Sequence, residues 1–354
     1  MADNIDIFDT LYLLGMAQEI NPVPSFFKDR YFGEEETFTQ DKVLIEFMNG
    51  DQKMVPFIAP KVGDIPVDRE GYELYEFAPS LIAPSRILTL DDLAKRGFGE
   101  PLLSGSTKAD RARAIQFRDL RDLSARIGRR EEWMAAQTMI NNGFDMQEYI
   151  DANTAGKTIP VRFYDTGGSN PAVYTVTPWS SWASAKSDIT AMCDDLTERG
   201  LPATDLVLGS TTWGTISGFS GFYDDLDNRS IDIGVIRASL AGTGVSYMGR
   251  LNIDGYNLDV FVAREKYKDA SGVAQSYFPA KSAMVTAPGC GKTAYGAVTQ
   301  IDFGSSEFST YEGKRIPKLT IEQNNDIRKL RLASRPFTAP KNMAPWMYAA
   351  NAVL

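Results

Sequence analysis

The chain has 354 residues, of which 43% are apolar and 23% charged, and its formal net charge is -9. This composition is typical of a globular chain with room for two lobes, and the acidic balance argues against a protein whose main task is to grip nucleic acid. The chain has no histidine, so it lacks the most common general base and zinc ligand. Catalysis is thereby disfavoured, and we expect no catalytic, cofactor or metal site.

The cysteines and the N-terminus give no sign of secretion. Cys193 and Cys290 lie far apart without metal-ligand spacing, and we expect them to be reduced, small apolar residues. The first residues, MADNIDIFDTLYLL, carry acids where a signal peptide has bases, and no run approaches the ~18 apolar residues that span a membrane. These features predict a soluble protein of a cytoplasm-like compartment, beginning with a short amphipathic segment over residues 5–20.

The next part of the chain predicts a β-hairpin. Phe38 to Phe47 has strand chemistry, Asn49-Gly50 is a strong turn signal, and residues 54–59 make a return strand. Residues 60–84 are rich in proline and glycine and lack apolar periodicity. We therefore expect an extended arm that reaches away from the core and buries its apolar residues elsewhere.

The longest helical signal runs from Lys108 to Asn142, where apolar residues recur at near-helical spacing. At 1.5 Å per residue this helix would be roughly 50 Å long. Its arginines leave two alternatives open. They form a solvated face paired to acids such as Asp119 and Asp122, or a face turned toward a polyanion or acidic neighbours. These arginines are Arg111, Arg113, Arg118, Arg121, Arg126, Arg129 and Arg130.

From residue 157 onward strands and helices alternate. Short strands precede a helix over residues 183–199, and a later hairpin is centred on Asp254-Gly255. The alternation from 183 to 300 predicts a compact α/β lobe. The last fifty residues predict two strands and a proline-rich exit that return to the first lobe.

The stretch TAPGCGKTAYG, residues 286–296, contains the Gly-Lys-Thr with which a nucleotide-binding P-loop ends. A P-loop needs a glycine five residues before the Gly-Lys pair, where this chain has Thr286, and it must open a helix. The residues that follow favour strand or turn. A glycine-rich turn between two strands is therefore the favoured interpretation, and Lys292 is a candidate for contacting a carboxylate on a neighbour. A nucleotide-binding protein using Gly291, Lys292 and Thr293 stays as the weak alternative.

Three segments carry a family resemblance that spans close to the whole chain. They are FTQDKVLIEFMNG, MVPFIAPKVGDIPVDREGYELYEFAPSLIAPSRILT and ADRARAIQFRDLRDLSARIGRREEWMAAQTMINNGF. In these segments the chain resembles the major capsid proteins of tailed phages, specifically the lambda-type capsid protein E family. The middle lobe is similar mainly in the order of its elements, and none of these motifs is a catalytic signature.

The resemblance implies an α+β chain with the Hong Kong 97-like capsid fold. It implies an N-terminal arm (1–32), an extended β-hairpin loop (33–85), a peripheral domain with a spine helix (86–182, helix 108–142) and an axial domain (183–303). Residues 304–354 would be C-terminal strands returning to the peripheral domain. The implied function is the major capsid protein of the icosahedral head of a tailed double-stranded DNA phage, and a nanocompartment shell of the same fold is the alternative.

The implied partners are further copies of the chain, in pentamers and hexamers of a closed shell. A separate scaffold protein, a portal and packaged double-stranded DNA without sequence-specific binding are expected, and a decoration protein is left open. The implied location is the virion, with assembly in the host cytoplasm. The expected inter-subunit contacts of the arm are Phe38, Val43, Ile45, Phe47, Val55 and Phe57. The charged candidates for contacts with neighbours or genome are Arg118, Arg121, Arg126, Arg129, Arg130 and Lys292.

Overall fold

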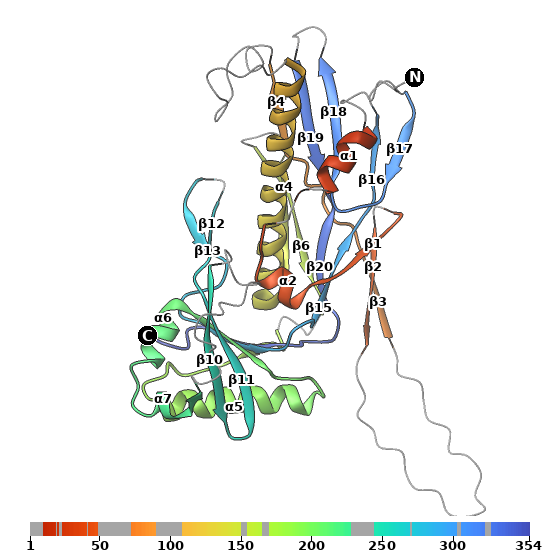
Figure 1. The fold of residues 1–354 in the computed structure, drawn as a ribbon. Coiled ribbons are helices and arrows are strands. Elements are labelled where there is room, and N and C mark those ends of the chain that lie inside the picture. The colour runs from red at the N-terminus through yellow and green to blue at the C-terminus, as the bar shows by residue number, and fades with distance from the viewer. Residues whose placement is uncertain are drawn as a thin grey trace, which may run out of the picture.

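The molecule is elongated, with a long helix at one end and a helix-covered sheet at the other (Figure 1). The computed structural model describes residues 10–18, 20, 23–40, 42–48, 72–89, 108–149, 154–164, 170–227, 244–269, 271–302, 306–322 and 327–354. Within these residues, no helix is both long and apolar enough to cross a membrane.

The long helix is α4, Lys108–Asn141, which confirms the helix predicted over 108–142. It ends because Asn142 and Gly143 adopt positive φ angles of 53° and 142°. A Cβ atom on Gly143 would lie 2.0 Å from the carbonyl oxygen of Val161, so only glycine fits there. The first half of α4 packs against helix α1 (Thr10–Gln18) and a three-stranded sheet.

That sheet has the order β18-β19-β4, with β4 at Ser85–Leu88, β18 at Ile316–Glu322 and β19 at Ile327–Ala333. Alternate residues of its strands face α4, as the period of two in a β-strand requires. They form one apolar cluster with α1 and α4, whose buried members include Leu13, Leu120, Leu123, Ile127, Leu319, Leu330 and Leu332. This cluster joins the N-terminal helix to the C-terminal strands.

The other end of the molecule is a seven-stranded sheet with the order β7-β21-β14-β8-β11-β10-β9. Its central strand β8, Asp205–Gly209, is buried at every residue, which suits the apolar run Leu-Val-Leu. Helix α5, Trp182–Glu198, packs its apolar side on β14 and β21, and its first turn is capped by Ser181. The remaining elements are β7 (Val173–Tyr174), β9 (Leu226–Asp227), β10 (Val245–Ile253), β11 (Tyr256–Ala263), β14 (Ala283–Thr286), β21 (Met347–Ala349), α6 (Ser210–Ile216) and α7 (Phe222–Asp225).

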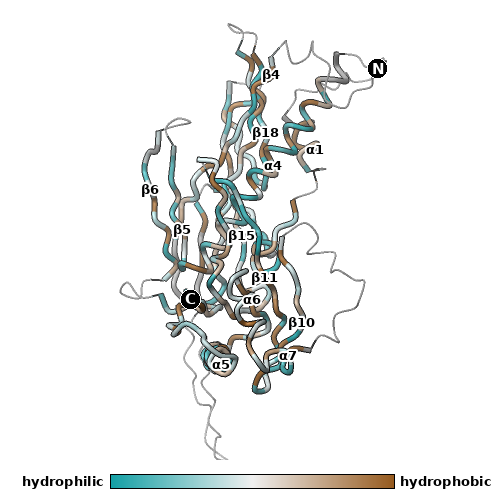
Figure 2. Tube along the Cα trace, turned by 90° about the vertical axis from the view of Figure 1, so that its left-hand side faces the viewer, coloured by the Kyte–Doolittle hydropathy of each residue, from teal (hydrophilic) through white to brown (hydrophobic). Residues whose placement is uncertain are grey.

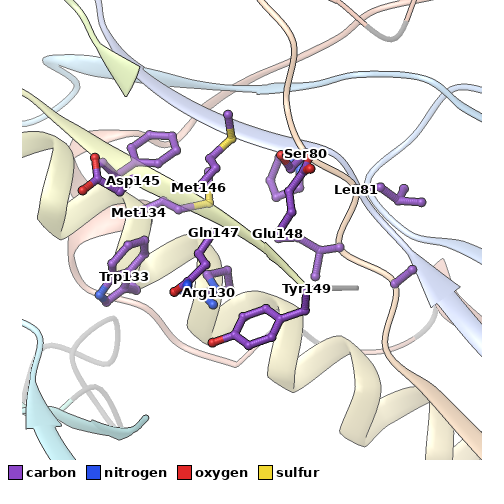
Figure 3. Close-up of a pocket in the computed structure, with 14 residues that line it drawn as sticks. Ser80, Leu81, Arg130, Trp133, Met134, Asp145, Met146, Gln147, Glu148 and Tyr149 are labelled. Carbon is purple, nitrogen blue, oxygen red and sulfur yellow. Dashed lines mark hydrogen bonds between the residues drawn. The ribbon is translucent and has the colours of Figure 1, made fainter. Parts of the chain in front are cut away.

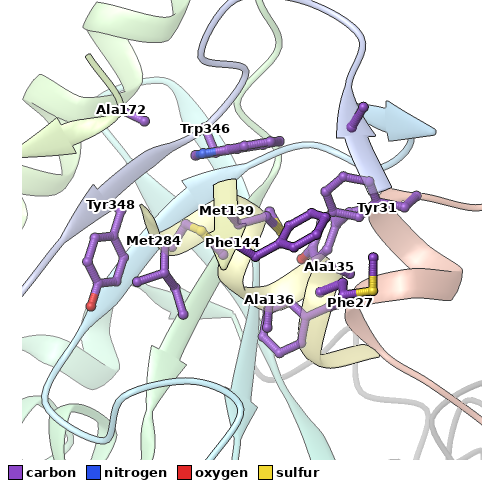
Figure 4. Packing of buried hydrophobic residues seen from close by; sticks show 14 of the residues in the cluster. Phe27, Tyr31, Ala135, Ala136, Met139, Phe144, Ala172, Met284, Trp346 and Tyr348 are labelled. Atoms are coloured by element: carbon purple, nitrogen blue, oxygen red, sulfur yellow. The ribbon is translucent and has the colours of Figure 1, made fainter. Parts of the chain in front are cut away.

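Between the two ends lies a second three-stranded sheet, in the order β1-β15-β20. Its strands are β1 (Glu34–Thr37), β15 (Gly291–Tyr295) and β20 (Pro336–Pro340), and the short helix α2 (Phe27–Tyr31) precedes β1. Aromatic and sulfur-containing side chains from α2, α4 and the C-terminal segment form the largest apolar cluster here (Figure 4). Phe27, Tyr31, Met139, Phe144 and Trp346 are among its buried members. This cluster connects the two ends of the molecule.

Strands β2 (Val43–Met48) and β3 (Tyr72–Phe77) form a two-stranded antiparallel sheet that leaves the body of the molecule (Figure 1). The hairpin partner of β2 is therefore β3 and not residues 54–59, which lie outside the described residues. The prediction of a loop over residues 60–84 is wrong for Tyr72–Phe77, because these residues form β3. The segment YELYEF alternates aromatic or aliphatic residues with acids, which is strand chemistry.

The C-terminus differs in part from the expected return to the long-helix end. β18 and β19 lie there, but β20 belongs to the sheet between the two ends, and β21 pairs with β14 and β7 in the seven-stranded sheet. Three smaller hairpins complete the chain: β5 (Gly143–Tyr149) with β6 (Ala155–Arg162), β12 (Lys266–Lys268) with β13 (Ala274–Ser276), and β16 (Val298–Ile301) with β17 (Phe308–Tyr311). In the side view β5 and β6 lie on one side of the molecule and α1 on the other (Figure 2).

One glycine after the end of α4 and one in its interior test this account of its termination. Gly143→Ala should destabilise the fold by about 2 kcal/mol or more, because alanine resists the positive φ angle and meets Val161. Gly128→Ala, inside α4 with open space around its Cβ, should instead stabilise by up to ~1 kcal/mol. Denaturant unfolding of both variants measures the difference, and equal effects would contradict it.

Candidate subunit interface

The N-terminal segment is fastened to the middle of α4 by Glu132. Its carboxylate accepts hydrogen bonds from the backbone N–H groups of Phe26, Phe27 and Lys28, at 3.0, 2.7 and 2.8 Å. These N–H groups open helix α2, where no helical carbonyl can pair with them. Glu132 is buried, so this contact holds α2 against α4 without competition from water.

The preceding residue, Glu131, is fully buried and holds two cations. The guanidinium of Arg315 donates to its two oxygens at 2.7 and 2.9 Å, and the Lys28 ammonium lies 3.3 Å away. Burial by itself would raise the pKa of Glu131, but the charges of Arg315 and Lys28 outweigh it and hold that pKa below its ordinary value. Glu131 therefore joins α2, α4 and the segment before β18.

Sequence reasoning missed this pair of glutamates. The signal was available, because Arg-Glu-Glu stands at the start of the apolar run Trp-Met-Ala-Ala in the second half of α4. Charged residues are almost never fully buried unless they are paired. Two acids beside an apolar run could therefore have been predicted to be buried and paired. The sequence could not have shown which residues pair with them.

Strand β1 is held by four lysines of the same chain. Glu34 pairs with Lys341, Glu35 with Lys28 and Lys314, and Glu36 with Lys292. The Lys292 ammonium lies 2.9 Å from the Glu36 carboxylate, because β1 and β15 run side by side in parallel register. The carboxylate that Lys292 contacts in this structure is therefore its own chain's Glu36.

The Gly-Lys-Thr motif is the beginning of strand β15. The turn before it, with Gly289 at a φ angle of 71°, connects β14 to β15 as predicted. A Cβ atom on Gly291 would lie 2.3 Å from ring atoms of Phe32, so this glycine is needed for packing. Because a strand follows in place of a helix, the motif has no helix N-terminus to offer a phosphate. The nucleotide-binding alternative is wrong for this site.

The same N-terminal segment also contacts the seven-stranded sheet. The guanidinium of Arg30 donates to Asp205 at the start of β8, with Nη2 2.9 Å from Oδ1, and the Tyr31 hydroxyl donates to Oδ2 at 3.1 Å. Arg30 also lies over the ring of Phe261, 4.5 Å from its centroid. The segment from Ser25 to Thr37 is thus tied to α4, β15 and the sheet at once.

The predicted arm contacts fall into three groups. Val43 and Ile45 are fully buried in the chain's own core, so these two have no apolar surface left for a neighbour and their assignment is corrected. Phe38 is half-buried and packs against the same core. The Phe47 side chain, Val55 and Phe57 lie outside the described residues.

The arginines of α4 from Arg113 onward are exposed, and the acids expected to pair with them also contact strand β4. Asp119 is buried and accepts from Arg86 of β4 at 3.0 Å. Asp122 pairs both with Arg86 and with Arg126, the latter at 3.1 Å. The pairing expected along the helix is therefore made between Asp122 and Arg126, and both acids also hold β4 through Arg86.

A groove of about 520 Å³ lies between α4, β5 and the segment after β3 (Figure 3). Trp133 and Met134 form part of its wall on α4, and Leu81 and Tyr149 are exposed at its rim. Its polar groups engage one another, since the Ser80 hydroxyl donates to Glu148 at 3.0 Å. No group of three metal-ligating side chains occurs among the described residues.

Two carboxyls near the contact of α2 and α4 have strongly raised pKa values. Burial raises the pKa of Glu132 to about 7, against the opposing effect of its three N–H donors. Burial also raises the pKa of Glu265, to about 8, and the nearby Glu132 charge adds to the shift. The Glu265 Oε2 atom is buried without a hydrogen-bond partner among the described residues, which suits a protonated carboxyl.

These shifts predict how stability depends on pH. Between the ordinary pKa of 4.5 and about 8, the folded chain binds more protons at Glu265 than the unfolded chain, so stability falls as the pH rises. Glu265→Gln should make that fall shallower, by less than the ~1.4 kcal/mol per pH unit of a fully buried group, because water screens part of the charge. Denaturant unfolding between pH 5 and 8 measures it. Glu198→Gln, an exposed carboxylate on α5, is the control. Equal slopes for Glu265→Gln and the unchanged chain would contradict the prediction.

Comparison with known proteins agrees with this architecture. A family model described as phage major capsid protein E matches residues 9–351. The major capsid protein of Escherichia phage lambda is 20% identical over 305 residues, which are 84% of this chain and 86% of the lambda protein. The major capsid protein of Enterobacteria phage P21 is 21% identical over 279 residues, covering 77% of this chain and 78% of that one.

Solved structures show the same fold. A prophage protein of Escherichia coli CFT073, described as a capsid protein, has a TM-score of 0.65 at 16% identity and covers 98% of this chain and 99% of its own. A phage-related protein of Bordetella bronchiseptica RB50 has a TM-score of 0.52 at 10% identity, with 96% of both chains covered. The expected α+β, Hong Kong 97-like fold is thereby confirmed. Because the family model spans nearly the whole sequence, the chain belongs to the phage major capsid protein E family.

Proposed function

We propose that this chain, a phage major capsid protein, closes an icosahedral head by placing its β2–β3 hairpin on a neighbouring copy. The observation that carries the proposal is the hairpin itself, which is anchored at its base and leaves the body (Figure 1). The anchor is apolar: Val43 and Ile45 are buried, and the ring of Phe77 stacks on Phe337 at 4.9 Å between centroids.

The physical reason lies in the weakness of an isolated hairpin. Two strands alone are marginally stable in water, and a third partner usually completes the burial. In the described residues β2 and β3 pair only with each other. A second copy of the chain can supply the missing surface, and a contact between different patches of two copies generates rings and shells when the rotation closes.

The finer features of the proposal follow from the family. Rings of five and six copies would form the shell, a separate scaffold protein and a portal would assist, and the shell would enclose double-stranded DNA. Assembly would take place in the host cytoplasm. The proposed role is structural and non-enzymatic.

Expression of the full chain, alone and with its neighbouring genes, followed by sizing and negative-stain electron microscopy, tests the proposal. Closed shells or rings are expected. Replacing residues 49–71 by Asn-Gly should leave a folded subunit, because Met48 and Tyr72 face each other in register and a two-residue turn can join them. This shortened chain should form no closed shells, and circular dichroism checks that it folds.

The apolar residues of the arm are tested by a subtler change. Val55→Ser with Phe57→Ser should also reduce closed shells at least tenfold, because the burial of apolar area drives the contact at ~25 cal/mol per Å². Val273→Ser, at an exposed apolar residue in the turn between β12 and β13, is the matched control. Normal shells from the shortened chain, or equal loss in the control, would overturn the role of the hairpin.

A further inference from the structure

The groove between α4, β5 and the segment after β3 lies against the base of the β2–β3 hairpin (Figure 3). One wall is formed by residues 80–83, which follow β3 in the chain. Pro336, another lining residue, stands next to Phe337, whose ring stacks on Phe77 at the hairpin base. The groove is therefore continuous with the part of the molecule from which the hairpin leaves.

One edge of strand β5 runs along the groove. Every residue from Asp145 to Tyr149 lines it. Because alternate residues of a strand point to opposite faces, a groove that touches all of them follows an edge of the strand. β6 takes one edge of β5, and β5 has no other partner among the described strands. The backbone groups of such an edge are a template for pairing with a further extended chain.

The side chains beside this edge are largely apolar. Leu81 and Tyr149 are 43% and 49% exposed at the rim, and Trp133 and Met134 form the wall on α4. Exposed apolar side chains around a hollow are typical of a binding site. The volume, about 520 Å³, lies in the ~300–1,000 Å³ range of pockets that enclose a drug-sized group, so the groove can take more than one apolar side chain.

We propose that the groove receives residues 54–59 of a neighbouring copy, an apolar run from the chain segment between β2 and β3. This rests on the proposed function, which places the hairpin on a neighbour, and it names the receiving surface. The run reads Met-Val-Pro-Phe-Ile-Ala and contains no charge. Pro56 and the following Pro60 favour an extended chain at the residue before each, which suits a strand edge.

The length of the segment allows this contact. Met54 follows Met48, the last residue of β2, by six residues, and an extended chain of that length spans ~20 Å. β2 and β3 lead away from the body of the molecule (Figure 1). They direct the run toward a second copy and not toward the groove of its own chain.

The charges at the two ends of the run match those of the groove rim. Lys53 and Lys61 flank the run. The rim carries two exposed acids, of which Asp145 pairs with Arg162 of β6 and Glu148 faces solvent. A lysine of the neighbouring copy can approach Glu148, and such an exposed pair sets the register of the run more than its affinity.

The first nine residues of the chain fit the groove less well. They carry three acids, which would meet the two acids of the rim at like charge. Arg130, the one cation of the described lining, lies over the Trp133 ring, 4.9 Å from its centroid, and is thus engaged within its own chain. An apolar run between two lysines is therefore the favoured occupant.

Cross-linking between copies tests the proposal. Two full-length chains are co-expressed, one with Ala59→Cys in the run and one with Gln147→Cys at an exposed position of β5. A short bismaleimide should give roughly tenfold more covalent dimer in their mixed shells than in shells of either variant alone, because a bound segment holds its thiol at a high local concentration. In the control, Ser271→Cys, exposed between β12 and β13, replaces Gln147→Cys. Shells of the unchanged chain give the background from Cys193 and Cys290.

Loss of the apolar rim gives an independent measurement. Leu81→Ser with Tyr149→Ser should reduce closed shells roughly tenfold, because both side chains lose apolar area that the run would cover. Val273→Ser with Leu354→Ser, at apolar residues that are more exposed, is the matched control, and circular dichroism checks that both variants fold. Equal loss of shells in the two variants would overturn the role of the groove.

The cross-linking results separate failure of this docking from failure of the proposed function. Closed shells without the dimer, or with as much dimer at the control position, would overturn the docking and leave the proposed function standing. A chain that carries both Ala59→Cys and Gln147→Cys tests its own groove, and an internal link without dimer would overturn the placement on a neighbour. Absence of shells and rings from the unchanged chain would overturn the proposed function, and the docking with it.

Discussion

The architecture depends on two adjacent carboxylates buried in the middle of α4. A buried charge lowers the stability of a fold unless it has a partner. Removing one partner of a buried pair therefore destabilises the protein, because the other charge stays buried and unpaired. Glu132 takes its partners from the first turn of α2, and Glu131 takes Arg315 and Lys28. These groups are distant in sequence. The contacts of these two carboxylates therefore bring together the N-terminal segment, the long helix and the segment before β18.

Most charged groups around these carboxylates have their partners within the same chain. The three glutamates of β1 and the Arg30 guanidinium all find their counter-charges within the chain. Among the described elements, strands β2 and β3 pair only with each other, and only the base of their hairpin is buried in the body. The hairpin is therefore the place where a second copy of the chain would complete the burial.

Local chemistry made part of this fold predictable from the sequence. The helix over 108–142 and the turn before the Gly-Lys-Thr follow from residues that are neighbours in the chain. The predicted partner of β2 was wrong. The strong turn signal at Asn49-Gly50 favoured a return strand directly after it, at residues 54–59, whereas β2 pairs with residues beyond Gly71. Contacts between residues that are distant in the sequence could not be predicted, because local patterns do not identify such partners. Nothing near Val43 or Ile45 says that they pack inside their own chain, and nothing near Glu131 names Arg315.

Asp119 and Asp122 show how a non-local contact changes the role that a sequence pattern predicts. From sequence alone, both acids could pair with arginines along their own helix, and the helix would be an ordinary solvated surface. In the structure Arg86, on strand β4, contacts both acids, and Asp122 also pairs with Arg126. The two carboxylates therefore hold β4 against α4. Because Arg86 stands 33 residues before Asp119, no periodicity within the helix could reveal this contact.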